Sequence, residues 1–329
     1  MTVRAAMCRA LGPPEVVRVE DVPPPALGDG QVRIAVEVAA VNFPDVLLVA
    51  GRYQIPVEPP FVPGSELAGV VTELGAGVGD LAVGDAVTGT GLVGAFAEEA
   101  VLGAHAVHRR PAGVSAAVAA ASGVTYKTAY HVLRSVAAVR PGDQLVVLGA
   151  GGGVGSAAVQ LGAHLGAVVT AVASSPEKLD VARRLGATNV VDHRVADLRQ
   201  ALRELLSDGA DVVVDPVGGA LAEPALRSVR WGGRFVTVGF ASGEIPRIPL
   251  NLVLLKGVQV LGFQFIDFAT HAPEELARNE AELAELLSAG TVQPHIGATY
   301  PLERAAEALR LVADGQAIGK VLIEIQGQE

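Results

Sequence analysis

The run Gly149-Ala-Gly-Gly-Gly-Val-Gly155 is the part of this 329-residue sequence that most directly suggests chemistry. It lies between a short apolar run and a segment with helical character, the context in which a pyrophosphate binds. Glycines allow close backbone approach, and a helix N-terminus offers free N–H groups. The alternative is a plain tight turn. We predict a dinucleotide site with contacts from Gly149, Ala150, Gly152, Gly153, Val154 and Gly155.

The end of the second predicted strand indicates which dinucleotide binds. NAD sites usually place Asp or Glu there, about 20 residues after the glycine loop. This chain has Ala173-Ser174-Ser175 instead, and Lys178 follows one helical turn later, in a chain with only four lysines. Hydroxyls would not repel a 2′-phosphate, and His193 after the third strand could add a contact. The pattern predicts NADPH, with a solvated surface lysine as the alternative for Lys178.

Two kinds of segment must position these residues. Up to about residue 120, short β-prone runs alternate with Pro- and Gly-rich turns, which predicts a compact barrel or sandwich. These strand candidates are 16–19, 32–38, 67–74, 83–88 and 96–101. From about residue 115, strands alternate with helices, which predicts βαβ units and a parallel sheet. The overall fold class is therefore α/β.

The elements of the second region can be assigned by periodicity. Its helix candidates are 115–122, 126–139, 153–165, 176–185, 197–207 and 220–229. Its strand candidates are 144–148, 168–173, 189–191, 211–215, 234–239 and 258–263. The tail adds a helix at 274–289, an extended piece at 292–300, a helix at 302–314 and a strand at 319–325.

Composition excludes several classes of protein. Half of the residues are hydrophobic, and no charged residue lies between Asp143 and Glu177, which raises the question of a membrane span. Seven glycines interrupt that stretch, so buried parallel strands explain it better. The net charge of −10 argues against nucleic-acid or anionic-membrane partners. No secretory signal is apparent, and we expect a soluble cytoplasmic protein.

The motifs together resemble a known family over nearly the whole chain. They are Val41-Asn-Phe-Pro-Asp45, Gly51-Arg-Tyr53, Pro63-Gly-Ser-Glu-Leu-Ala-Gly69, the glycine loop, Asp215-Pro-Val-Gly-Gly219 and Gly319-Lys320. In this order they are similar to the medium-chain dehydrogenase/reductase superfamily, and within it to the zinc-free, zeta-crystallin-like NADPH:quinone oxidoreductases. The resemblance implies a GroES-like β-rich catalytic domain at 1–121, a Rossmann NADP-binding domain at 122–268, and a return to the catalytic domain at 269–329.

The same resemblance bears on zinc. Zinc-dependent relatives carry Cys where this chain has Asn42, and Gly-His-Glu where it has Gly64-Ser65-Glu66. A catalytic zinc needs at least three N, S or O ligands, and the single cysteine, Cys8, cannot form a cysteine cluster. We therefore expect no metal, and reduction of a quinone or activated double bond rather than zinc-assisted alcohol oxidation.

The resemblance also implies roles for single residues. Asn42, Tyr53 and Thr125 match family positions near the reacting atoms, and Tyr53 could donate a proton or hydrogen bond to the acceptor oxygen. Ordinary packing is the alternative for Tyr53, and a structural turn is the alternative for Asn42. Further cofactor contacts implied by the resemblance are Gly239, Phe240, Phe263, Phe265 and Lys320.

Three functions remain open from the sequence. The first is direct hydride transfer from NADPH to a quinone. The second is an enoyl or alkenal reductase, for which a CoA substrate would favour a basic patch from residues such as Arg52, Arg247 or Arg278. The third is an NADPH-binding structural or RNA-binding protein. Because the run 258–265 is apolar and β-prone, we also expect a homodimer.

Overall fold

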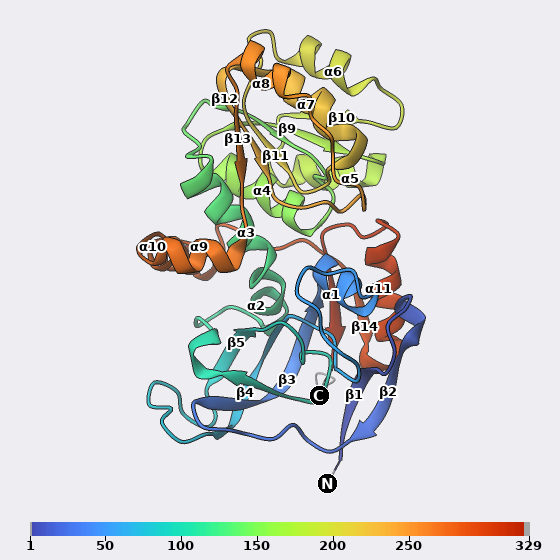
Figure 1. The fold of residues 1–329 in the computed structure, drawn as a ribbon. Coiled ribbons are helices and arrows are strands. Elements are labelled where there is room, and N and C mark those ends of the chain that lie inside the picture. The colour runs from blue at the N-terminus through green and yellow to red at the C-terminus, as the bar shows by residue number, and fades with distance from the viewer. Residues whose placement is uncertain (1, 326–329) are drawn as a thin grey trace. The chain divides into compact units, whose positions relative to one another are not determined.

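The computed structural model of the chain describes residues 2–325, and it divides into two units (Figure 1). Unit 1 combines Met1–Val124 with Ile296–Glu329, and unit 2 is Thr125–His295. The chain therefore leaves unit 1 once, after Val124, and re-enters it at Ile296. These two passages are called the first and second crossings below.

Unit 1 is built on a seven-stranded sheet with the long strand β3 near its centre. The sheet order is β14 (Ile296–Pro301), β15 (Lys320–Glu324), β3 (Gln31–Val41), β4 (Glu66–Leu74), β5 (Ala86–Thr90) and β7 (Val107–Arg109), and β6 (Glu99–Gly103) also pairs with β3. A two-stranded sheet, β1 (Val3–Cys8) and β2 (Val17–Val22), completes the β structure. Three helices accompany it: α1 (Phe43–Val49), α2 (Ala116–Ser122) and α11 (Ala305–Ala313).

Unit 2 is a six-stranded parallel sheet. The strand order is β10 (Asn189–Asp192), β9 (Val168–Ala173), β8 (Gln144–Val147), β11 (Ala210–Asp215), β12 (Val229–Thr237) and β13 (Gln259–Gly262). In sequence order this is 3-2-1-4-5-6, the arrangement of dinucleotide-binding sheets. The prediction of an α/β protein with a β-rich part and a doubly wound parallel sheet is confirmed.

Helices cover both faces of the unit 2 sheet. One apolar cluster joins the strands to α3 (Thr125–His131), α4 (Gly153–His164), α5 (Pro176–Arg184) and α10 (Pro273–Ser288). A second joins the opposite face to α6 (Leu198–Leu205), α7 (Ala222–Ser228) and α8 (Leu250–Lys256). The uncharged stretch after Asp143 thus forms β8, α4 and β9 inside this core. Within the described residues, no helix is long and apolar enough to cross a membrane.

The boundary of the returning segment differs from the expected one. The chain re-enters unit 1 at residue 296 rather than 269, because the helices α9 (Phe265–His271) and α10 belong to unit 2. Leu283 of α10 is buried in the core of unit 2, and the Asn279 Nδ2 donates to Ser135 Oγ over 2.8 Å. The first boundary also lies slightly later, after Val124. The last residues of the predicted return, 326–329, lie outside the described part.

Candidate active site

The glycine loop joins β8 to α4 through a turn that excludes side chains. Gly149 has a φ of +60°, and its carbonyl accepts a hydrogen bond from Gly152 N over 2.9 Å. A Cβ at Gly155 would lie 2.1 Å from the Gly149 carbonyl oxygen, so only glycine fits there. Because Gly152 is the N-cap of the 12-residue helix α4, the first N–H groups of the helix face the turn without intrahelical acceptors. This geometry fits a bound pyrophosphate.

A buried aspartate holds the next loop against the glycine turn. Asp215, at the end of β11, accepts hydrogen bonds at Oδ1 from Val217 N and Gly218 N, both over 2.8 Å. A Cβ at Gly149 would lie 2.6 Å from Val217 Cγ2, so the two loops are in contact. Burial raises the pKa of the Asp215 carboxyl. No role for Asp215 was predicted from the sequence, although its motif is one of those that carry the family resemblance.

The positive charges predicted for a 2′-phosphate gather beside the glycine loop. Lys178 Nζ donates to Ser174 Oγ over 3.3 Å, and the side chain of Lys178 lies so close to Gly151 that a Cβ there would sit 2.5 Å from it. Burial and the positive charge of Arg194 lower the pKa of Lys178. Burial is also the main reason that the pKa of His193 is lowered, with Arg194 and Lys178 contributing. An anion bound here would relieve this mutual repulsion.

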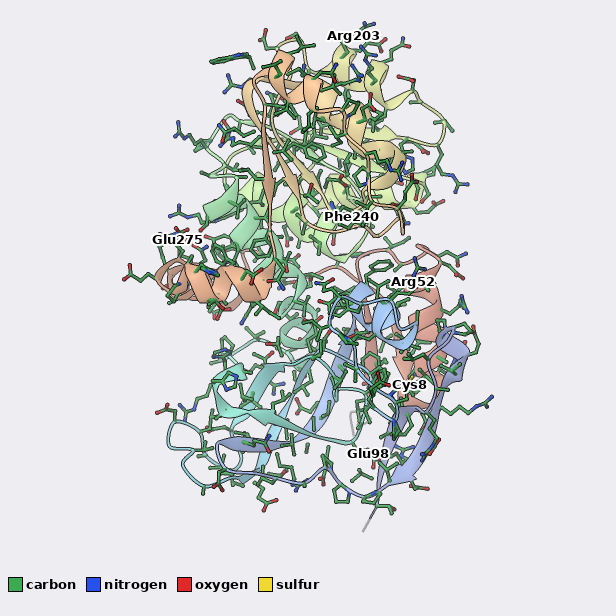
Figure 2. All side chains as sticks on the ribbon, viewed as in Figure 1. Cys8, Arg52, Glu98, Arg203, Phe240 and Glu275 are labelled. Carbon is green, nitrogen blue, oxygen red and sulfur yellow. The ribbon has the colours of Figure 1, made fainter. Side chains whose placement is uncertain are left out.

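Four other predicted cofactor residues follow the neighbouring strands. Gly239 and Phe240 follow β12, and Phe240 is partly exposed (labelled in Figure 2). Phe263 and Phe265 follow β13, with ring centroids 6.3 Å apart in an edge-to-face arrangement. Ligands of doubly wound sheets bind outside the carboxyl ends of the strands. The structure therefore brings these residues to the same edge of the sheet as the glycine loop.

Unit 1 contains a buried polar cluster, which we call the Glu66 cluster: Asn42, Ser65, Glu66 and Lys320. Lys320 Nζ donates to Glu66 Oε1 over 2.6 Å, to Asn42 Oδ1 over 2.7 Å and to the Val41 carbonyl over 3.4 Å. Asn42 Nδ2 donates to Glu66 Oε1 over 2.8 Å and to Ser65 Oγ over 3.1 Å. Lys320 and Glu66 are only 2% and 1% exposed, so this ion pair is shielded from water.

The cluster changes how two predicted site residues are understood. The three hydrogens of the Lys320 ammonium are all donated inside unit 1, whereas the resemblance implied a cofactor contact. The Asn42 amide is likewise committed to Lys320, Glu66 and Ser65 on both its oxygen and its nitrogen. Asn42 also begins α1, where its backbone N–H donates to Asp45 Oδ2 over 2.7 Å. The structural role considered as the alternative for Asn42 is thus the start of a helix rather than an isolated turn.

Tyr53 and Asp45 lie close to this cluster in unit 1. Burial raises the pKa of the fully buried Asp45 carboxyl to about 7. Burial also raises the pKa of the half-buried Tyr53, and the negative charge of Asp45 raises it further. The Tyr53 phenol therefore keeps its proton well above neutral pH. Thr125, the third predicted catalytic residue, is 4% exposed at the first position of α3 in unit 2.

The Glu66 cluster does not fit a zinc ion. Asn42 and Ser65 offer neither a thiolate nor an imidazole, and Lys320 already places a cation against the oxygens of Asn42 and Glu66. In the described part of the chain, no three His, Cys, Asp or Glu side chains are grouped so that they could hold a metal ion. A second cation at this place would be repelled by the ammonium.

Sequence reasoning did not find the ion pair, although a signal was present. Glu66 is the first residue of β4 and is followed by apolar residues, and Lys320 immediately precedes the run Val321–Ile323. Charged residues at the ends of buried strands need partners, because an isolated buried charge is very costly. That rule predicts that both side chains are paired, but it does not identify the partner of either one.

Comparison with known proteins agrees with this architecture. Residues 28–112 match the model of the alcohol dehydrogenase GroES-like domain, and residues 153–284 match the model of the zinc-binding dehydrogenase family. The chain is 37% identical over 323 residues to a quinone oxidoreductase-like protein 2 homolog from Nematostella vectensis, covering 97% of this chain and 88% of that protein.

Two further comparisons extend the picture. The crystal structure of Escherichia coli quinone oxidoreductase complexed with NADPH superposes with a TM-score of 0.90 at 27% identity, covering 98% of this chain and 99% of that one. Polyketide synthase GfsB from Streptomyces halstedii is 39% identical over 300 residues, which are 91% of this chain but 5% of that protein. The chain is an oxidoreductase and belongs to the quinone oxidoreductase family of the medium-chain dehydrogenase/reductase superfamily.

Proposed function

We propose that this oxidoreductase uses NADPH. The observation that carries the proposal is the group of Lys178, His193 and Arg194 beside a glycine turn, at a place where NAD sites carry an acid. The backbone N–H groups at Gly152–Gly155 would bind the pyrophosphate, and Lys178 with Ser174 would bind the 2′-phosphate. NADPH in the related Escherichia coli structure supports the same assignment.

Replacing Lys178 tests the choice of cofactor. In Lys178→Ala we expect the Kd for NADPH to rise on the order of tenfold to a hundredfold, the usual value of one charge-assisted hydrogen bond. The Kd for NADH should hardly change, because NADH lacks the 2′-phosphate. Fluorescence titration of both cofactors measures this. Lys256→Ala, on α8, is the matched control and should alter neither affinity. Equal loss for both cofactors would remove the assigned role.

The proposed reaction is hydride transfer to a quinone. Bound NADPH supplies a hydride from C4 of its nicotinamide. In unit 1, the Tyr53 phenol would donate a hydrogen bond or proton to the acceptor oxygen as negative charge develops there. Thr125, at the start of α3, is proposed to orient the nicotinamide. The names of the related quinone oxidoreductases support a quinone as the acceptor.

We also propose that the reaction needs no zinc. The residues at the expected ligand positions are Asn42 and Ser65, and the Lys320 ammonium already neutralises Glu66 there. Unit 1 then supplies no metal Lewis acid to acidify an alcohol. This favours an acceptor that takes hydride without such help, such as a quinone or an enone.

A panel of acceptors tests the reaction. Purified enzyme with NADPH is mixed with ortho- and para-quinones, enals and crotonyl-CoA, and cofactor absorbance is followed with and without a chelator. We expect turnover with quinones that is insensitive to the chelator. Binding of NADPH without turnover of any acceptor would instead support a structural or RNA-binding role. Turnover that zinc restores after chelation would contradict metal independence.

An enoyl reductase is the second candidate. The observation in its favour is the 39% identity to a small part of a polyketide synthase. Of the arginines proposed for a CoA-binding patch, Arg247 lines a cavity of about 520 Å³ in unit 2. Arg199 and Arg227 line it too, but so do Asp197, Glu223 and Glu244, which balance the three positive charges. Arg278 instead bonds to Asn279 within α10, and Arg52 follows α1 in unit 1 (Figure 2). Preference for crotonyl-CoA over every quinone in the panel would favour this candidate.

Replacing Tyr53 tests the proton donor. Tyr53→Phe removes the hydroxyl and keeps the ring, and we expect kcat to fall about a hundredfold while the Kd for NADPH is unchanged. Because burial and Asp45 raise the pKa of Tyr53, the wild-type rate should stay flat through neutral pH. It should decline only above the ordinary tyrosine value of about 10. Tyr53→Phe should lack this alkaline decline. An unaltered pH profile in Tyr53→Phe would contradict the assignment.

We further propose that the protein is a homodimer. Strand β13 is an edge of the unit 2 sheet, and Val260 on it is 47% exposed. On α8 and β12, Leu254, Leu255 and Trp231 are exposed by 81%, 74% and 81%. A β-edge and apolar residues of this kind favour pairing with a second copy.

Light scattering after size exclusion tests the dimer. At micromolar concentration the wild-type protein should elute as a dimer, and Leu254→Glu/Leu255→Glu should elute as a folded monomer because two charges would be buried without partners. Val195→Glu is the control, since Val195 is an exposed apolar residue of unit 2 outside this edge. A monomeric wild-type protein would refute the proposal.

A further inference from the structure

The Glu66–Lys320 ion pair lies beside both places where the chain passes between the units. Glu66 uses Oε1 for Lys320 and Asn42, but its other oxygen has a different partner. Glu66 Oε2 accepts a hydrogen bond from Val124 N over 2.6 Å. Val124 is the last residue of unit 1 before the first crossing. One carboxylate thus binds the lysine and the outgoing chain at the same time.

The backbone at the first crossing leaves room for the Glu66 carboxylate. Between the end of α2 at Ser122 and the start of α3 at Thr125, the backbone has only Gly123 and Val124 to make the passage. A Cβ at Gly123 would lie 2.9 Å from Glu66 Oε2 and 3.0 Å from Thr90 Cγ2, so a larger residue would push the carboxylate aside. The glycine therefore allows close approach of Glu66 to the Val124 N–H.

Lys320 connects the same pair to the incoming chain. It is the first residue of β15, and in the parallel ladder with β14 its register partner is Ile296. Ile296 is the first residue of unit 1 after the second crossing. Close packing holds the next residue as well, because a Cβ at Gly297 would lie 1.9 Å from the Ile318 carbonyl oxygen. The lysine that neutralises Glu66 is therefore built into the strand pair that receives the returning chain.

We propose that Glu66 and Lys320 are positioning residues, whose ion pair couples the first crossing at Val124 to the second crossing at Ile296. Through the pair, the two connections are fixed to one buried point of unit 1 rather than moving separately. Glu66 binds the first directly, and Lys320 binds the second through its strand. The low exposure of both side chains keeps water from competing for these bonds.

The coupling has a consequence for catalysis that rests on the proposed function. Thr125 follows Val124 directly, so a loosened crossing would change the placement of the residue that is proposed above to orient the nicotinamide. Small misplacements of reacting groups can lower rates a hundredfold. The residues proposed above to bind the pyrophosphate and the 2′-phosphate, in contrast, all belong to unit 2. Loss of the pair should therefore slow hydride transfer without weakening NADPH binding.

Hydrogen–deuterium exchange of Glu66→Gln tests the coupling without any need for turnover. A glutamine offers one acceptor oxygen, so it cannot serve both Lys320 and Val124 N–H. We expect faster exchange in peptides that contain Val124 and also in peptides that contain Ile296, the register partner of Lys320. Single-turnover hydride transfer should fall on the order of tenfold to a hundredfold with an unchanged Kd for NADPH.

Controls make the result decisive. Glu37→Gln breaks an ion pair with Arg110 in unit 1 that lies at neither crossing, and it should leave both sets of peptides unchanged. Glu66→Gln alone leaves the buried Lys320 ammonium without a counter-charge, which could unfold the protein. The double variant Glu66→Gln/Lys320→Met removes both charges and serves as the test in that case. The double variant should also show faster exchange in both the Val124 peptides and the Ile296 peptides. Faster exchange confined to Val124 peptides, or at neither crossing, would overturn the coupling. A wild-type enzyme inactive with every acceptor would refute only the proposed reaction.

Discussion

The ion pair between Glu66 and Lys320 is the interaction on which the interior of unit 1 depends. Two buried charges are tolerated only when each is neutralised and its remaining hydrogen-bonding capacity is used, and both conditions are met here. Asn42 and Ser65 are oriented by the pair, and α1 starts from Asn42. The Lys320 ammonium therefore organises the polar groups of the Glu66 cluster.

Much of the fold could be predicted from the sequence, because local patterns determine it. The strands of unit 2 are buried on both faces, so runs such as 168–173 and 211–215 appear as continuous apolar, β-branched segments and end within a residue of the observed strands. Short amphipathic elements were harder to recognise. Helix α1 was not predicted, and a turn was only the alternative considered for Asn42, because Asn42-Phe-Pro begins turns and helices alike. The place of α10 could not be predicted, since one apolar stripe can pack against either unit.

The parts of the candidate site that could be predicted are those whose residues lie close together in the sequence. The glycine turn, Ser174 and Lys178 lie within 30 residues of one another in a recognisable βαβ unit. The Glu66–Lys320 contact joins residues 254 positions apart, and it is set by the pairing of β15 with β3 and of β3 with β4. No periodicity in the sequence encodes that pairing. The sequence predicts which charges must be paired, and only the sheet topology identifies their partners.

The position of β15 in its sheet also affects how the chain folds while it is being synthesised. Because β15 lies between β14 and β3, unit 1 obtains an inner strand of its sheet only after all of unit 2 has been translated. Unit 2 is one continuous segment, so it can fold on the ribosome as soon as it has emerged. Until β15 has been translated, the edge of β3 at Val38–Val41 stays unpaired. A chain truncated before β15 would therefore contain a folded unit 2 and an incompletely folded unit 1 that is prone to aggregate.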